Sequence, residues 1–182
     1  LSRGRRWTTL TILTCRKIVR IAVIDSSSLI NLTHLGLAEQ LSLFFDRVYV
    51  PSAVQREVNK KSRFRYRLNR LYGARFYRRC RAADKTNVRL LLSELDEGES
   101  EALVQAQEKG ALFFVGDEKR ARKVAQTMGR KPVGTLRLLA RLNLQGQASD
   151  PRTLVEKLRR EIGFRVSEEV VAEAIAMAPE PI

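Results

Sequence analysis

Two aspartates in this sequence each stand close behind an apolar stretch and in front of a segment with helical character. Asp25 follows the run Ile21–Ile24 directly, and Asp117 follows the run at 111–115 after a single glycine. If the runs are parallel strands, both carboxylates lie at the carboxyl ends of the strands, where α/β sheets bind their ligands. The alternative is that each aspartate only caps the helix that follows it, as aspartate often does. Position alone leaves both interpretations open.

Helical phase favours an inward position for Asp117. Side chains three, four or seven residues apart share one face of a helix. Apolar residues lie four, seven, eight and eleven positions after Asp117, at Ala121, Val124, Ala125 and Met128. Asp117 therefore falls on the stripe that we expect to be buried, whereas Glu118 points more to the side.

Two glutamates show a similar inward phase. Glu99 precedes apolar residues at 102, 103 and 106, and Glu57 lies beside apolar residues at 54 and 58. Glu101 falls about 200° from Glu99 around the helix, so we expect it on the solvated side. The residues predicted to share that side are Gln105 and Glu108.

Four inward carboxylates, Asp25, Glu57, Glu99 and Asp117, would repel one another and raise each other's pKa unless a cation balanced them. Mg²⁺ or Mn²⁺ meets this need, because both prefer oxygen ligands and require no histidine or cysteine. Such an ion can activate water and stabilise charge on a phosphodiester during hydrolysis. The alternative is four unrelated capping or surface carboxylates.

The overall charge indicates a polyanionic partner. The chain carries 34 Lys and Arg against 20 Asp and Glu, a net charge of +14. A large basic excess on one domain favours binding to nucleic acid, with the basic side chains on the phosphate backbone. The alternative is a protein that is generally basic without such a partner.

Other residue types limit the chemistry and the location. His34 is the only histidine, which excludes a site built from several histidines. The two cysteines, Cys15 and Cys80, lack metal-site spacing and indicate reduced thiols in a cytoplasmic protein. No apolar run approaches the length of a membrane span. Residues 1–17 are basic and diluted with threonine, so we expect a flexible extension in preference to a signal peptide.

Strand and helix patterns alternate along the chain, which predicts one α/β domain with a mostly parallel sheet. Strands are predicted at 18–24, 47–50, 111–115 and 132–133. Helices are predicted at 27–36, 51–59, 86–95, 97–109, 117–128, 135–143, 151–162 and 167–176. The arginine-rich and aromatic-rich stretch at 60–81 is predicted to be helical, with a break near Gly73.

Five motifs in order resemble the PIN-domain family, in particular the VapC-like toxin branch and relatives with a GExEA motif. They are VIDSSSLINL, VYVPSAVQREV, LDEGESEAL, FFVGDEKRAR and PVGTLRLLAR. The resemblance covers about residues 19–145. It implies a three-layer α/β/α sandwich with four to five short strands. We expect a PIN-like domain at 18–147, with an insertion at 60–85, and a helical extension at 148–182 packed on the same domain.

The resemblance also implies a function, that of a Mg²⁺- or Mn²⁺-dependent nuclease that usually acts on RNA. The family's acidic quartet corresponds to Asp25, Glu57, Glu99 and Asp117, with Asp25, Glu99 and Asp117 as the chief metal ligands. Supporting roles near the site are expected for Ser27, Asn31, Glu101, Glu118 and Thr135. Ordinary capping or core-edge roles remain the alternative for Ser27, Asn31 and Thr135.

The insertion is long for the family and adds candidate contacts to RNA. Its arginines predicted to bind nucleic acid are Arg63, Arg65, Arg67, Arg70, Arg75, Arg78 and Arg79. The same stretch could instead bind an antitoxin protein or a second subunit. The toxin-like resemblance implies an antitoxin partner and a homodimer.

Two other functions are compatible with parts of the pattern. One is a non-catalytic RNA-binding protein with the same fold, although it would have no reason to bear the repulsion within the quartet. The other is a phosphatase with Asp25 as the nucleophile. Aspartate phosphatases of the haloacid dehalogenase type carry a second aspartate two residues later, where this chain has Ser27.

Overall fold

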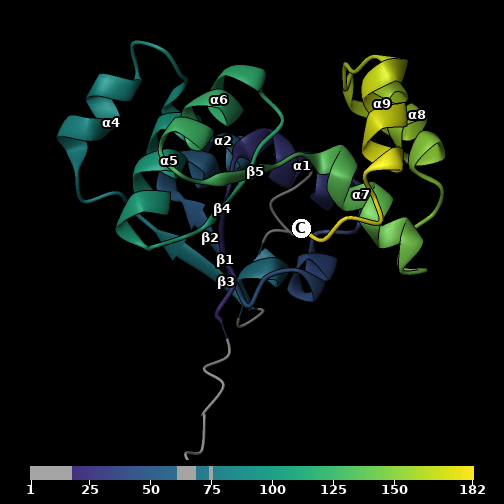
Figure 1. Cartoon of the computed structure of the whole chain (residues 1–182). Coiled ribbons are helices and arrows are strands. Elements are labelled where there is room, and N and C mark those ends of the chain that lie inside the picture. The colour runs from purple at the N-terminus through teal and green to yellow at the C-terminus, as the bar shows by residue number, and fades with distance from the viewer. Residues whose placement is uncertain (1–17, 61–68, 74–75) are drawn as a thin grey trace, which may run out of the picture.

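The computed structural model describes residues 18–60, 69–73 and 76–182 and contains a central sheet of five parallel strands (Figure 1). The strand order is β3-β2-β1-β4-β5, and every neighbouring pair runs in parallel. The strands are β1 (Ile21–Ile24), β2 (Arg47–Pro51), β3 (Tyr77–Cys80), β4 (Phe113–Val115) and β5 (Lys131–Val133). The predicted α/β class with a parallel sheet is confirmed.

Helices connect the strands, as parallel pairing requires. They are α1 (Ser26–Leu35), the 3₁₀-helix η1 (Glu39–Leu43), α2 (Ser52–Lys60), α4 (Lys85–Leu91), α5 (Glu97–Glu108), α6 (Lys119–Thr127), α7 (Thr135–Leu144), α8 (Pro151–Ile162) and α9 (Glu168–Ala176). Residues 69–73 are also helical. Most helix ends follow from local sequence; for example, Asp150 caps α8 through the N–H of Thr153, and Gly163 ends α8 with a φ of 71°.

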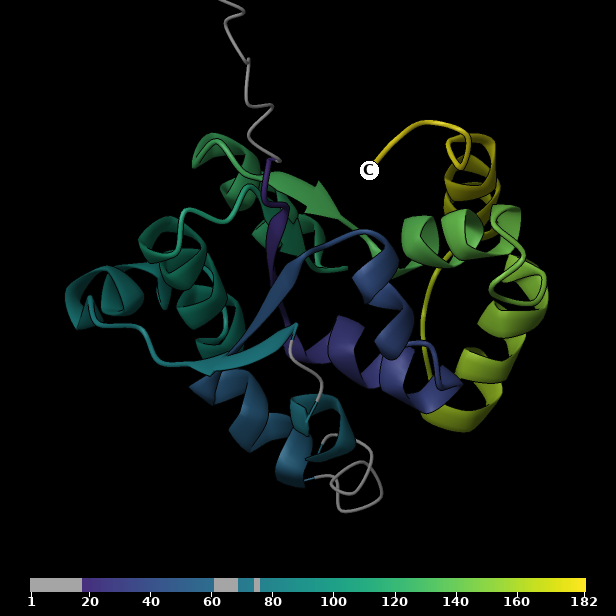
Figure 2. The ribbon, with the colours of Figure 1, turned by 90° about the horizontal axis from the view of Figure 1, so that it is seen from below.

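The two faces of the sheet bury alternate residues of each strand, because side chains in a strand point to opposite faces. Ala22 and Ile24 of β1 contact the larger apolar cluster, which includes leucines of α1, α7 and α8. Val23 of β1 and Phe114 of β4 contact the smaller cluster, which is formed with alanines and a leucine of α5 and α6. Helices therefore cover both faces, in three layers (Figure 2).

The C-terminal helices pack beside α7, on the side of the molecule away from α4 (Figures 1 and 2). A small apolar cluster joins the three helices through Leu136 of α7, Val155 of α8 and Val171 of α9. The backbone between α8 and α9 is fixed as well, because Arg159 donates a hydrogen bond of 2.8 Å to the carbonyl of Val166. This connector forms part of the functional site described below.

The prediction of a helix throughout 60–81 is wrong at its end. Residues Tyr77–Cys80 form β3, the edge strand that pairs with β2. Tyr77 is buried and donates a hydrogen bond of 2.8 Å to the carbonyl of Ala38, whereas Arg78 and Arg79 are exposed. Pro51 likewise ends β2, and α2 begins at Ser52. Residues 1–17, predicted to be a flexible extension, lie outside the described residues.

The strand order has its reversal at β1. The chain passes from β1 to β2 and β3 in one direction, and then returns to the other side of β1 with β4 and β5. Ligands of open α/β sheets bind at this point, beyond the carboxyl ends of the strands. Asp25 follows β1 and Asp117 follows β4, so these two aspartates flank the reversal. None of the described helices is both long enough and apolar enough to cross a membrane.

Candidate active site

An acid-lined cavity of about 480 Å³ opens at the carboxyl ends of β1 and β4. All four acids of the predicted quartet line it, and they come from four different elements or loops. The residues around it are Asp25, Ser26, Ser27, Ile30, Asn31, Glu57, Asp96, Glu99, Asp117, Glu118, Ile162, Gly163, Phe164 and Arg165. We call this space the acid cavity.

Asp25 is both a helix cap and a wall of the acid cavity, so its two interpretations do not exclude each other. Its Oδ1 accepts a 2.7 Å hydrogen bond from the backbone N–H of Ser28 in the first turn of α1. The hydroxyl of Ser27 donates to both carboxylate oxygens, at 3.2 and 3.1 Å. The backbone N–H of Asp25 donates to the carbonyl of Val115, which ties the end of β1 to β4.

Asp117 does not cap the helix that follows it. Its Oδ1 accepts a 2.7 Å hydrogen bond from the backbone N–H of Thr135, and its Oδ2 accepts a 2.6 Å hydrogen bond from the Thr135 hydroxyl. The side-chain amide of Asn31 donates to Oδ2 at 3.3 Å, and the hydroxyl of Ser28 donates to it at 3.5 Å. Donors from α1 and α7 therefore hold this carboxylate over the end of β4.

Glu57, Glu99 and Asp96 form the opposite side of the acid cavity. Glu99 is 8% exposed and forms a capping box with Asp96 at the start of α5. Asp96 accepts a 2.7 Å hydrogen bond from the N–H of Glu99, and Glu99 accepts one of 3.2 Å from the N–H of Asp96. Glu118 lines the cavity from the loop before α6 and is exposed.

Three glycines lie against these carboxylates, at positions where a side chain would intrude. A Cβ on Gly116 would come within 3.0 Å of Asp25 Oδ2, and a Cβ on Gly134 within 3.3 Å of Asp117 Oδ1. A Cβ on Gly98 would come within 3.4 Å of Asp96 and 3.6 Å of Glu57. The backbone thus approaches the carboxylates closely from several loops.

The electrostatic environment favours the neutral form of several of these acids. Burial, reinforced by the charge of Asp117, raises the pKa of Asp25 to about 7. Burial also raises the pKa of Asp117, against the opposing hydrogen bonds from Thr135 and Asn31. Burial and the charge of Asp96 raise the pKa of Glu99. Raised carboxyl pKa values in one cavity are a physical mark of a functional site.

Glu101 is placed differently from its prediction. It is 4% exposed, not solvated, and it does not line the acid cavity. Its carboxylate accepts hydrogen bonds from the Ser52 hydroxyl and from the N–H groups of Ala53 and Ala82, at 2.5 to 3.2 Å. Glu101 therefore stabilises the start of α2, which packs against α5, and these hydrogen bonds lower its pKa. Gln105, predicted on the same solvated side, is also buried.

Three features of the site were missed by sequence reasoning. Ser28 contacts both aspartates, but three consecutive serines gave no way to choose among them. Asp96 could have been found from its spacing, because Asp96 and Glu99 match the capping-box pattern. The contribution of Phe164 and Arg165 depends on how α8 and α9 pack, and no local pattern signals it.

The donors in the acid cavity fit a divalent cation in chemical type, since carboxylate oxygens are the ligands that Mg²⁺ and Mn²⁺ prefer. The described residues nevertheless include no group of three or more acidic, histidine or cysteine side chains that could hold one ion. Asp25 and Asp117 are bound to internal donors, and Glu99 is engaged with Asp96. The site thus supplies suitable donors, several of which are engaged in hydrogen bonds within the protein.

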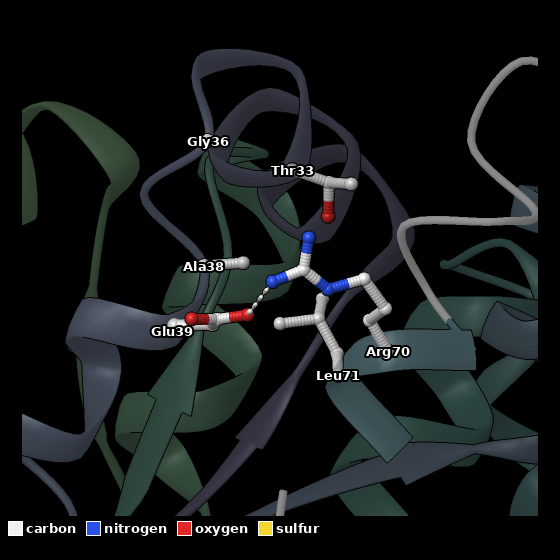
Figure 3. Close-up of a pocket in the computed structure, with 6 residues that line it drawn as sticks. All are labelled: Thr33, Gly36, Ala38, Glu39, Arg70 and Leu71. Atoms are coloured by element: carbon white, nitrogen blue, oxygen red, sulfur yellow. Dashed lines mark ion pairs between the residues drawn. The ribbon is translucent and has the colours of Figure 1, made fainter. Parts of the chain in front are cut away.

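The arginines of the predicted insertion lie away from the acid cavity where they can be located. Arg70 lines a separate cavity of about 200 Å³ with Thr33, Gly36, Ala38, Glu39 and Leu71, and its guanidinium points toward Glu39 at 3.8 Å (Figure 3). Arg79 lies over the ring of Tyr72, 4.1 Å from its centroid. Arg63, Arg65, Arg67 and Arg75 lie outside the described residues.

The fold and site define an α/β protein with an acidic cavity at the reversal of a parallel sheet. A model of a PIN-domain family, DUF3368, matches residues 21–180, and the chain belongs to this family. The match includes α8 and α9, so it extends well beyond residue 145. PIN domains are generally nucleases and typically use divalent metal ions. A comparison with curated proteins gives no match.

Proposed function

We propose that this protein is a Mg²⁺- or Mn²⁺-dependent endoribonuclease that hydrolyses RNA phosphodiesters in the acid cavity. The observation that carries the proposal is the convergence of Asp25, Glu57, Glu99 and Asp117 on one cavity from four separate parts of the chain. Placing the half-buried Asp117 beside the buried Asp25 is unfavourable for folding while both are charged. A binding site for a cation explains why the chain retains this arrangement.

RNA is proposed as the substrate because the chain as a whole is strongly basic. A net charge of +14 attracts a phosphate backbone, whereas the cavity itself repels one until its charge is balanced. Asp25, Glu99 and Asp117 would hold the cation, and Glu57 would hold either the cation or the attacking water. When bound, a divalent cation would balance the carboxylates and polarise water and the scissile phosphate.

The residues around the acids hold them in place for this role. Ser27 and Ser28 hydrogen-bond to Asp25, and Thr135 and Asn31 hydrogen-bond to Asp117. Fixing the carboxylates in this way reduces the reorganisation that metal and substrate binding would otherwise require. Phe164 and Ile162 add apolar side chains to the lining of the acid cavity.

The decisive experiment is cleavage of a labelled single-stranded RNA with Mg²⁺ or Mn²⁺, with and without chelator. Asp25→Asn should abolish cleavage, because asparagine retains the helix cap but loses the charge. Asp84→Asn is the matched control, since Asp84 caps α4 in the same way and does not line the acid cavity. Full activity of Asp25→Asn, or full activity in chelator, would refute the proposal.

The alternative of a non-catalytic RNA-binding protein has one observation in its favour. The described acids are not gathered closely enough for three of them to coordinate one ion. RNA binding that persists in chelator, with no cleavage under any divalent ion tested, would establish this alternative.

The proposal extends to a biological role as the toxin of a toxin–antitoxin pair that acts as a homodimer. It is supported by the five ordered motifs that resemble the VapC-like branch. Expression of the wild-type chain should arrest growth of a bacterial host, whereas Asp25→Asn should not. A small gene next to the coding sequence whose product relieves the arrest would identify the antitoxin. Sedimentation of the purified chain tests the dimer.

A further inference from the structure

We infer that the acid cavity continues into an arginine-lined subsite that binds a phosphate next to the scissile one on single-stranded RNA. This inference rests on the proposed function and assigns Arg122 and Arg165 as the phosphate-binding residues. It concerns the path of the substrate backbone, which the acidic quartet does not define.

Asp117 stands at the junction of two cavities. Beside the acid cavity lies a second space of about 170 Å³, and the two share Asp117, Phe164 and Arg165 in their walls. The second space adds Arg122 and Arg137. A chain leaving the carboxylates past Asp117 therefore enters a space that contains three guanidinium groups.

The charges of the two spaces differ sharply. Asp25, Glu57, Asp96, Glu99, Asp117 and Glu118 line the acid cavity, and among the described residues Arg165 is the only basic one in its lining. The described acids that line the second space are Asp117 and Glu173. RNA carries a negative charge at every nucleotide, so each phosphate needs a positive partner. A cation held by the acids would serve the scissile phosphate, and the arginines would serve the next one.

Arg165 is held firmly at this boundary. Gly163 ends α8 in the left-handed conformation, with a φ of 71°, and redirects the chain toward the site. Phe164 packs against the apolar clusters, and Val166 accepts the hydrogen bond from Arg159. Arg165 thus projects from a connector that is anchored on both sides, as a residue that positions substrate should be.

Arg122 faces the same boundary from α6. Its Nη1 would lie 3.9 Å from a Cβ on Gly134, the residue that also lies against Asp117 Oδ1. Within the described part of the chain, the guanidinium groups of Arg122 and Arg165 make no hydrogen bond and no close ion pair. Arg137 differs, since it donates to the carbonyl of Pro181 and lies 3.7 Å from Glu180. Two guanidinium groups thus keep donors for a phosphate, which they bind with good geometry.

The test is RNA binding in an Asp25→Asn background, where cleavage does not obscure affinity. Fluorescence anisotropy with a labelled single-stranded RNA compares Arg122→Gln with Arg165→Gln and the double variant. Each single variant should weaken binding about tenfold. It should also lower the slope of log affinity against log salt by about 0.7. Arg120→Gln and Arg160→Gln are matched controls, because both residues are exposed arginines on α6 and α8 and line neither cavity.

Neutral methylphosphonate replacements, placed one at a time along the RNA, locate the contact. At one position beside the scissile phosphate, the replacement should weaken binding to the parent protein and have no further effect on the double variant. The inference would be overturned if the control variants lost as much RNA affinity as the Arg122 and Arg165 variants. It would also be overturned if, at every position, the methylphosphonate weakened binding to the double variant as much as binding to the parent protein. An absence of RNA binding by the parent protein would overturn it as well. So would arginine variants that are less stable but bind RNA with unchanged affinity.

These outcomes are separable from failure of the proposed function. A protein that binds RNA through Arg122 and Arg165 and cleaves none of it retains the subsite and loses the nuclease assignment. If the wild-type protein cleaves RNA but the double variant binds RNA as tightly as its parent, the nuclease assignment stands and the proposed subsite is wrong.

Discussion

Thr135 donates to both carboxylate oxygens of Asp117, at 2.7 Å from its backbone N–H and 2.6 Å from its hydroxyl. The two residues come from different βα junctions, since Asp117 follows β4 and Thr135 begins α7 after β5. The pair fixes the carboxylate in orientation and stabilises its charged form against the effect of burial. Removing one of the two hydrogen bonds should therefore affect the site without dismantling the fold.

Thr135→Val removes the hydroxyl and retains the backbone donor and the side-chain shape. We expect RNA cleavage to fall about 10- to 100-fold, the usual cost of losing a residue that orients a metal ligand. Thr135→Ser retains the hydroxyl and should keep most of the activity. The initial rate should be measured as a function of metal concentration. Unchanged rates and unchanged metal dependence in the valine variant would show that this hydrogen bond does not matter for the site.

Gly116→Ala should damage both the fold and the site. The added Cβ would overlap the ring of Phe114, which is fully buried, and would lie 3.0 Å from Asp25 Oδ2. We expect the free energy of unfolding to fall by about 1–3 kcal/mol, as for other overpacked sites. Urea unfolding measures this loss. Gly73→Ala is the control, because a Cβ at that position meets no atom within 4 Å among the described residues, apart from its own chain neighbours and helix backbone. Equal stabilities of the two variants would contradict the prediction.

Glu101→Gln should lower stability although Glu101 lies outside the acid cavity. The carboxylate satisfies Ser52, Ala53 and Ala82, and an amide nitrogen in place of one oxygen would face donors. The expected loss is about 1–3 kcal/mol in the free energy of unfolding. Because the folded pKa of Glu101 is lowered, its contribution is present above its unfolded pKa and disappears as the pH falls through the folded value.

The control for this variant is Glu97→Gln, which alters an exposed pair with Arg56 on the same two helices. Its effect should stay within about 0.5 kcal/mol. Urea titrations of both variants at neutral pH make the comparison. An RNA-cleavage defect in Glu101→Gln without any loss of stability would instead assign Glu101 to the chemistry.

Short-range patterns predicted much of the fold and of the site. Apolar runs located β1, β2 and β4, and the predicted helix at 151–162 matches α8 at both ends. The four acids were predicted to meet because they follow strands or share the phase of apolar stripes, and all four line one cavity. These features depend on a few neighbouring residues, so one sequence contains the information.

The errors come from features set by packing between distant segments. β3 contains two arginines among its four residues, and only pairing with β2 makes it a strand. The prediction placed Glu101 in solvent because it assumed that one face of α5 is exposed. In the structure, α2 and α4 pack against α5, and Glu101 is buried. The hydrogen bonds that Glu101 accepts come from residues 19, 48 and 49 positions away in the sequence.

The contribution of Asp25 to the stability of the metal-free protein should fall as the pH rises from about 4 to about 7. The pKa of Asp25 is raised from 3.8 to about 7 by burial and by the charge of Asp117. Across this window the unfolded chain releases the proton while the folded chain retains it. Stability from this group is therefore complete below the unfolded pKa and is lost as the pH passes through the folded pKa. Three pKa units correspond to about 4 kcal/mol as an upper bound.

Urea unfolding in chelator at about pH 5 and about pH 8 tests this dependence, with Asp25→Asn as the comparison. Other groups also titrate, so the informative quantity is the difference between the two proteins. The wild-type chain should lose stability relative to Asp25→Asn as the pH rises. Adding Mg²⁺ or Mn²⁺ at the higher pH should restore stability in the wild type and much less in the variant, because a cation binds the ionised carboxylates. Parallel pH profiles for both proteins would mean that the Asp25 carboxylate ionises without cost, and the electrostatic argument for a cation in the acid cavity would fail.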